Sequence, residues 1–200
     1  MTMETTMKSS RRNTLLVVAA VLLVLGLGAW WFSGSTQHPF PLVAGETVED
    51  WSFQGSHADG GENEARVRAE IERLEGLFGN PEGDPTDYVL YVSIANQYRM
   101  LGDGKKEYEY LGRALIEDSD RTGLAWHNMG HLLAGLGALE SAKLAFENAI
   151  KAQALPQYQN AYIRFLEQYM PEDTEAIQAA EEGRNTGGVV EVEGQSVIVE

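Results

Sequence analysis

The sequence predicts an all-α domain behind one N-terminal transmembrane helix. Residues 14–32 form an apolar run without a charge, long enough to cross most of a ~30 Å hydrocarbon core. Between residues 62 and 183, apolar side chains recur at helical spacing, with charged side chains on the other faces. Within this helical part, aromatic and small residues return after 35 residues, which is typical of stacked helix pairs.

The net charge and the missing cysteines exclude several classes of function. The chain carries 30 acidic and 15 basic side chains, a formal charge of -15, which opposes binding to nucleic acid or to anionic lipid headgroups. Without cysteine there are no disulfides, zinc thiolate sites or thiol catalysis. We therefore expect no nucleic-acid partner.

The flanks of the apolar run predict its orientation. Lys8, Arg11 and Arg12 precede it, whereas residues 33–65 contain no Lys or Arg. Basic residues stay on the cytoplasmic side, so residues 1–13 are expected to be a cytoplasmic tail and the bulk of the chain extracytoplasmic, either periplasmic or extracellular. Two tryptophans at the end of the run suit the headgroup level and favour a retained anchor, with a cleaved signal peptide as the alternative.

Residues 33–61 are rich in Gly, Ser, Thr, Pro and acids and have no sustained periodicity. This composition predicts a flexible linker between the anchor and the folded domain. Trp51 and Phe53 interrupt its polarity. We expect them to pack back onto the first helix of the domain, with a short docking motif as the alternative.

Large and small residues alternate at fixed spacing from position 126 onward. The spacing follows W-x2-L-G-x2-Y and then A-x3-F, in Trp126, Met129, Gly130, Leu133, Gly137, Ala142, Phe146 and Ala149. Moved back 35 residues, the pattern returns in Tyr91, Ile94, Ala95, Tyr98, Gly102, Leu111 and Ala114. Over residues 88–170 the chain resembles the tetratricopeptide repeat (TPR) family, in particular membrane-anchored bacterial-type members. The resemblance implies a short solenoid of antiparallel helix pairs, with Tyr91, Ala95, Tyr98, Trp126, Gly130, Ala142 and Phe146 as its structural residues.

Two copies of the repeat are clear, and the flanks are expected to cap them. Glu107 departs from the pattern, because it falls where the second copy has Ala142, at a close contact between helices, unless the register slips. A partial third copy ends before Pro171. Capping helices are predicted over residues 62–78 and 172–183, and the tail 184–200 is expected to be flexible or to form a hairpin.

His127 and His131 lie four residues apart on a predicted helix, a spacing that would let both imidazoles reach one metal ion. With Trp126, Met129 and Leu133 directed inward, the helical phase turns both histidines toward the face that lines the concave groove in TPR proteins. The sequence around them lacks the glutamate of H-E-x-x-H and a clear third ligand, so we expect no bound metal and no cofactor.

The predicted function is that of a membrane-anchored scaffold or assembly factor that binds a protein or peptide. The expected partner-binding residues are Asn96, Arg99, His127, Asn128, His131 and Arg164. The asparagines match positions that hydrogen-bond a peptide backbone in the family, and the arginines suit an acidic side chain or a C-terminal carboxylate. No catalytic motif is present, so no enzyme activity is expected. The alternative is a metal- or haem-handling module that uses the two histidines.

Overall fold

The computed structural model describes residues 38–80 and 83–185, which contain seven α-helices and no strand. The helices are α2 (Glu62–Glu75), α3 (Asp87–Leu101), α4 (Gly104–Glu117), α5 (Leu124–Gly135), α6 (Leu139–Ala152), α7 (Pro156–Tyr169) and α8 (Thr174–Asn185). None of these helices is long and apolar enough to cross a membrane. The predicted span 14–32 and nearly all of the tail lie outside the described residues.

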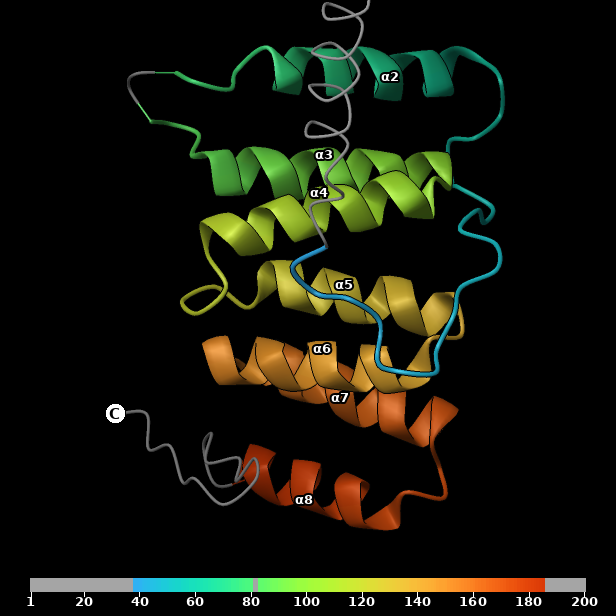
Figure 1. Cartoon of the computed structure of the whole chain (residues 1–200), viewed down its shortest axis with the longest axis vertical. Helices are drawn as coiled ribbons and strands as arrows, with labels where there is room; N and C mark the ends of the chain where they lie inside the picture. The colour runs from blue at the N-terminus through green and yellow to red at the C-terminus, as the bar shows by residue number, and fades with distance from the viewer. Residues whose placement is uncertain (1–37, 81–82, 186–200) are drawn as a thin grey trace, which may run out of the picture. The chain divides into compact units, whose positions relative to one another are not determined.

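Each helix packs against the next one along the chain, from α2 to α8 (Figure 1). Short turns join α3 to α4 and α5 to α6, so each of these pairs is an antiparallel hairpin, and they are the most closely packed pairs. The core consists of the apolar faces that the hairpins turn toward one another, including Leu90, Ile94, Leu111, Met129, Leu133 and Phe146. The prediction of an all-α domain of packed helix pairs is confirmed.

The two hairpins close with the same backbone hydrogen bonds, 35 residues apart. Gly102 and Gly137 both adopt left-handed φ angles, 73° and 81°, which only glycine adopts without strain. Around the first glycine, the N–H groups of residues 102 and 103 donate to the carbonyls of residues 99 and 98. Residues 137 and 138 donate to residues 134 and 133 in the same way. The register therefore does not slip, and Glu107 occupies the place that Ala142 occupies in the second hairpin.

Gly130 of α5 packs directly against the side chain of Phe146 of α6. A Cβ atom at this position would lie 2.9 Å from the ring of Phe146, which is itself 1% exposed. The predicted structural residues Ala95 and Ala142 are also fully buried, whereas Tyr91, Tyr98 and Trp126 are half-buried. The Trp126 indole N–H donates to the carbonyl oxygen of Ser119 at 2.8 Å.

The capping helices differ from their predicted bounds: α2 at its C-terminal end, and α8 at both ends, since it covers Thr174–Asn185 and not 172–183. Helix α2 ends at Glu75 instead of continuing to residue 78, and a turn follows it. Helix α8 begins at Thr174 because the carboxylate of Asp173 accepts the N–H of Ala176 and so closes its first turn. The same carboxylate pairs with Lys143 of α6 at 2.7 Å, which ties α8 to the second hairpin.

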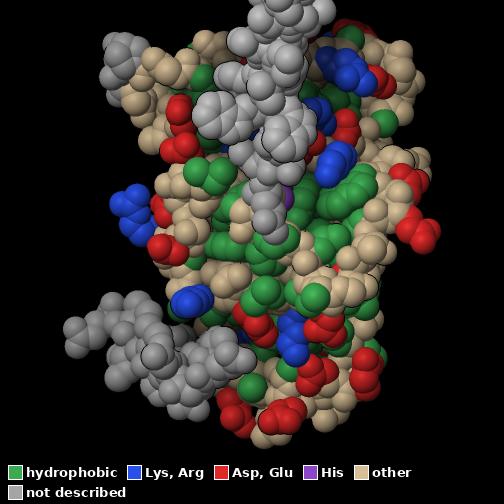
Figure 2. All heavy atoms as spheres, viewed as in Figure 1, with side chains coloured by type: hydrophobic (Ala, Val, Ile, Leu, Met, Phe, Trp, Pro, Cys, Tyr) green, Lys and Arg blue, Asp and Glu red, His purple; other side chains and the backbone are tan. Residues whose placement is uncertain are grey.

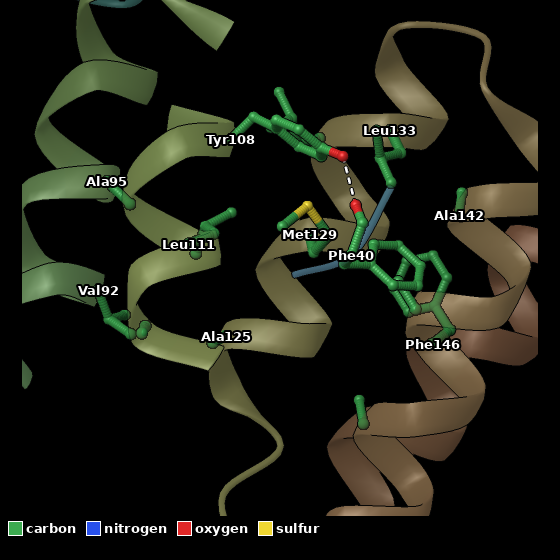
Figure 3. Close-up of a cluster of buried hydrophobic side chains, with 14 of the residues drawn as sticks. Phe40, Val92, Ala95, Tyr108, Leu111, Ala125, Met129, Leu133, Ala142 and Phe146 are labelled. Atoms are coloured by element: carbon green, nitrogen blue, oxygen red, sulfur yellow. Dashed lines mark hydrogen bonds between the residues drawn. The ribbon is translucent and has the colours of Figure 1, made fainter. Parts of the chain in front are cut away.

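Residues 38–57, here called the strap, run along α4, α5 and α6 before the chain enters α2 (Figure 1). Phe40 is 6% exposed and meets the ring of Trp126 edge to face at 4.9 Å. Its carbonyl oxygen accepts the hydroxyl of Tyr108, the contact drawn in Figure 3. The His38 ring stacks on Tyr108 at 3.6 Å, and its Nε2 donates to the Tyr108 carbonyl oxygen at 2.9 Å. In Figure 2, apolar side chains gather across the middle of the face along which the strap runs.

The strap also caps α6. The residue before this helix is Ala138, which has no side chain able to cap it. Glu46 supplies the cap instead, because its carboxylate accepts the N–H groups of Glu140 at 2.8 Å and Ser141 at 2.9 Å. A carboxylate at a helix N-terminus satisfies free N–H groups and is favoured by the helix dipole.

These contacts correct the expectation of a flexible linker over residues 33–61, whose described part begins at His38. The strap is packed against three helices by stacking, buried apolar surface and hydrogen bonds. The expected packing of Trp51 and Phe53 on the first helix is also wrong. Trp51 lies against Tyr108 of α4, with the Lys105 ammonium 4.9 Å from the centre of its ring, and Phe53 is 37% exposed.

Gly130→Ala should destabilise the domain by about 1 to 3 kcal/mol, because the added methyl group overlaps the Phe146 ring. Gly135→Ala is the control in the same helix. No atom lies within 4 Å of its added Cβ, so the change should be neutral or stabilise by about 0.5 kcal/mol. Urea unfolding of both variants measures the difference, and equal stabilities would contradict the close packing of α5 on α6.

Phe40→Ala should reduce the free energy of unfolding by about 3 kcal/mol, because a buried aromatic side chain is lost. Phe53→Ala, at an exposed position of the same segment, should change it by less than about 1 kcal/mol. The variants are compared by chemical unfolding and by the rate of proteolysis within residues 38–57. If Phe40→Ala left both unchanged, the strap would be a loose linker.

Candidate partner-binding face

The predicted partner-binding residues of α3 and α5 are joined by hydrogen bonds. The Asn128 side-chain amide donates to the Asn96 side-chain oxygen at 3.1 Å. Arg99 Nη2 donates to the Asn128 carbonyl oxygen, also at 3.1 Å. Asn128 is only 8% exposed, so it joins the two helices and is poorly accessible to a partner, whereas Asn96 is half-buried.

Arg99 also pairs with a buried carboxylate on α4. Its Nε donates to Glu107 Oε1 at 2.8 Å, and the Glu107 side chain is 1% exposed whereas that of Arg99 is 36% exposed. Glu107 Oε2 is buried and has no hydrogen-bond partner among the described residues. Burial raises the pKa of Glu107 to about 7, although the neighbouring Arg99 opposes this rise. Arg99 therefore links α3, α4 and α5 and reaches the surface between them.

His127 and His131 lie side by side on α5, with ring centroids 4.6 Å apart and the rings edge to face. His127 is half-buried, and its ring centroid lies 5.0 Å from that of Tyr158 of α7. His131 is exposed, and its ring meets Phe146 of α6 edge to face at 5.1 Å. The two imidazoles of α5 thus lie against α6 and α7.

The charged neighbours of the two histidines are cations. Burial, together with the nearby His131, Arg99 and Arg164, lowers the pKa of His127 to about 4. The pKa of His131 is lowered by desolvation and by the same two arginines. Both imidazoles are therefore neutral at pH 7, beside two guanidinium groups on α3 and α7. We call Asn96, Arg99, Glu107, His127, Asn128, His131 and Arg164 the polar cluster.

The arrangement favours an anion over a metal cation. A bound cation would be repelled by the two guanidinium groups, whereas a carboxylate would be attracted. Within residues 38–80 and 83–185, no three His, Asp or Glu side chains are placed to hold a metal ion. His127 Nδ1 is buried and has no hydrogen-bond partner within the described part of the chain.

Sequence reasoning identified six members of the polar cluster but not the role of the seventh, Glu107. The signal was present, because Glu107 breaks the repeat at a position where the second hairpin has alanine. Its partner Arg99 lies eight residues earlier, across the turn between α3 and α4, and only the folded hairpin brings the two side chains together.

Comparison of the chain with protein-family models, with curated proteins and with solved structures gives no match.

His127 should make the domain less stable in acid. Its pKa of about 4 in the folded protein lies below the ordinary histidine value of 6.5, so its neutral form is favoured by folding. Its contribution is present above pH ~6.5 and is lost as the pH falls toward 4. His127→Gln should therefore gain stability relative to the wild type over this range, by roughly 1 to 2 kcal/mol because solvent screens a half-buried site.

The measurement is urea unfolding of both proteins between pH 4 and pH 8. His57→Gln removes a histidine of the strap outside the polar cluster and serves as the control. A constant difference between His127→Gln and the wild type at all pH values would show that His127 is not buried in its neutral form.

Proposed function

We propose that this protein is a membrane-anchored scaffold or assembly factor that binds a protein or peptide through the face of α3, α5 and α7. The polar cluster carries the proposal. It combines side chains from separate helices, and two of them, His131 and Arg164, are exposed. Binding surfaces built on helix pairs commonly use one face contributed by alternate helices.

The TPR resemblance supports this assignment. The turns at Gly102 and Gly137 have the same hydrogen bonds, and in the second hairpin the small residue Gly130 lies where the paired helices meet, as the repeat pattern requires. In a solenoid of this kind α3, α5 and α7 are the first helices of successive pairs, and first helices line the concave surface in similar proteins. The proposed binding face is that surface.

The charge distribution supports an acidic segment as the partner. The chain as a whole carries a charge of -15, but the charged groups that lower the pKa of the histidine pair are Arg99 and Arg164. A partner with aspartate or glutamate side chains would meet these cations and the neutral imidazole of His131. Complementary charge of this kind directs partner choice and association rate more than total affinity.

The anchor places this function at a membrane. In the proposed topology residues 14–32 cross the bilayer, with the N-terminus cytoplasmic and the helical domain on the extracytoplasmic side. Only the five residues 33–37 separate the proposed span from His38, the first residue of the strap. A partner bound by the domain would therefore be tethered to the membrane through the proposed span.

A metal- or haem-handling role is the second candidate. Two adjacent imidazoles whose lowered pKa values keep them neutral are suitable ligands. The neighbouring Arg99 and Arg164 oppose this role, because a bound cation would add to their charge. Binding of an acidic protein segment agrees with both observations and is preferred.

The combined change His131→Ala and Arg164→Ala should remove partner capture while the thermal midpoint stays nearly unchanged, because both side chains are exposed. Arg99 is left in place, since its loss would strand the buried Glu107 carboxylate. The full chain is crosslinked in native membranes, and the captured proteins are identified by mass spectrometry and compared with the wild type.

Arg113→Ala is the matched control, because it removes an exposed cation of α4 outside the polar cluster. It should leave the captured set unchanged. Capture that survives in the His131 and Arg164 variant would move the interface to another surface. Capture that is lost in that variant but restored by added zinc or haem would favour the second candidate.

A further inference from the structure

The second hairpin shows that the fold does not need the Arg99–Glu107 pair. Because the turns are equivalent at a separation of 35 residues, Arg99 corresponds to Ala134 and Glu107 to Ala142. Both alanines are buried, at 7% and 0% exposure. The same contact between paired helices is therefore closed without any polar group in one hairpin and with a charged pair in the other.

A charged pair at this contact between helices carries a desolvation cost that apolar side chains do not have. Burying a carboxylate removes it from water, and a buried pair often contributes no more stability than apolar side chains of similar size. Here the compensation is incomplete, because only Oε1 of Glu107 has a partner. A residue that breaks the local pattern at a cost in stability marks a functional position more often than a packing one.

The geometry indicates what the pair does. Glu107 is fully buried and holds Nε of Arg99, while Nη2 of Arg99 is held by the Asn128 carbonyl oxygen. Two bonds from two helices fix the guanidinium plane at the edge of the polar cluster. The Arg99 side chain remains 36% exposed, and these two bonds use only two of the five N–H donors of its guanidinium group. An arginine fixed in this way presents its donors with little loss of side-chain entropy.

We propose that Glu107 is a positioning residue of the partner-binding face: it holds Arg99 so that the guanidinium is presented beside His127 and His131. The pair thus belongs to recognition and not to packing. This inference rests on the proposed function for its purpose, but its geometry is tested without a partner.

The histidines report where the Arg99 charge lies, because Arg99 lowers the pKa of both. Arg99→Gln removes this charge but, unlike alanine, keeps a side-chain N–H able to donate to the buried Glu107, and it should raise both pKa values by about half a unit or more. The pKa values are measured by NMR on the full chain in detergent micelles with 13C-labelled histidine. Signals are assigned with His38→Gln and His57→Gln variants.

Two substitutions at Glu107 separate position from charge. Glu107→Gln keeps an oxygen in place to accept the Arg99 Nε–H but removes the negative charge, so the guanidinium should stay and both histidine pKa values should remain low. Glu107→Asp keeps the charge but is one methylene shorter, so Arg99 should leave its place and both pKa values should rise toward the result of Arg99→Gln, by about half a unit.

The opposite pattern would overturn the proposal. If Glu107 acted only through its charge, Glu107→Gln would lower the histidine pKa values and Glu107→Asp would leave them unchanged. Glu109→Gln, on the same helix and paired with Lys106, should change neither histidine and is the control. Should the aspartate variant fail to fold, a lowered pair of pKa values in Glu107→Gln still refutes positioning, and unchanged values support it.

A failure of this experiment leaves the proposed function standing, because His131 and Arg164 could still bind a partner. Suppose instead that the pKa values change as expected but partner capture survives in the His131 and Arg164 variant. Glu107 would then hold Arg99 as proposed, but the face would not be the binding surface. The two results are therefore distinguishable.

Discussion

A left-handed glycine in the turn after α3, and another in the turn after α5, is the constraint on which the rest of the domain depends. Gly102 and Gly137 close their turns with the same pair of N–H to carbonyl bonds, so the second helix of each hairpin starts in the same register against the first. Residues 35 apart then share one backbone environment. The two hairpins therefore share one backbone arrangement and differ in their side chains. Comparing equivalent positions shows which side chains the packing of a hairpin requires.

One such difference explains why the strap is part of the domain. Asp103 precedes α4, and its carboxylate accepts the Lys106 N–H, whereas the equivalent residue before α6 is Ala138 and has no capping group. Glu46 supplies the missing acceptor from almost a hundred residues away in sequence. The strap satisfies the N–H groups that a local cap would satisfy, and Phe40 adds buried apolar surface beside them.

Much of this fold could be predicted from the sequence, because helical periodicity and the glycine turns are local signals. The helices, the contact of Gly130 with Phe146 and the partial third copy α7 all follow from spacing. The strap could not be predicted in this way. It has no periodicity, and its contacts join residues such as Phe40 and Tyr108 that are 68 positions apart. Composition typical of a linker is also compatible with an extended segment that packs on helices.

The same limit applies to the polar cluster. Helical phase correctly directs His131 outward, but it cannot tell that Asn128 is covered by its bonds to α3, since coverage depends on the neighbouring helix. Helical periodicity likewise shows only that Glu107 departs from the repeat pattern. The reason for this departure is its ion pair with Arg99, which lies on the other side of the turn. Because Ala134 and Ala142 close the same contact without charge, packing alone does not require the pair. The first hairpin therefore combines a backbone arrangement that the second hairpin also has with a charged pair that the second lacks, and this difference is the basis for the proposed role of Glu107 and Arg99 in binding.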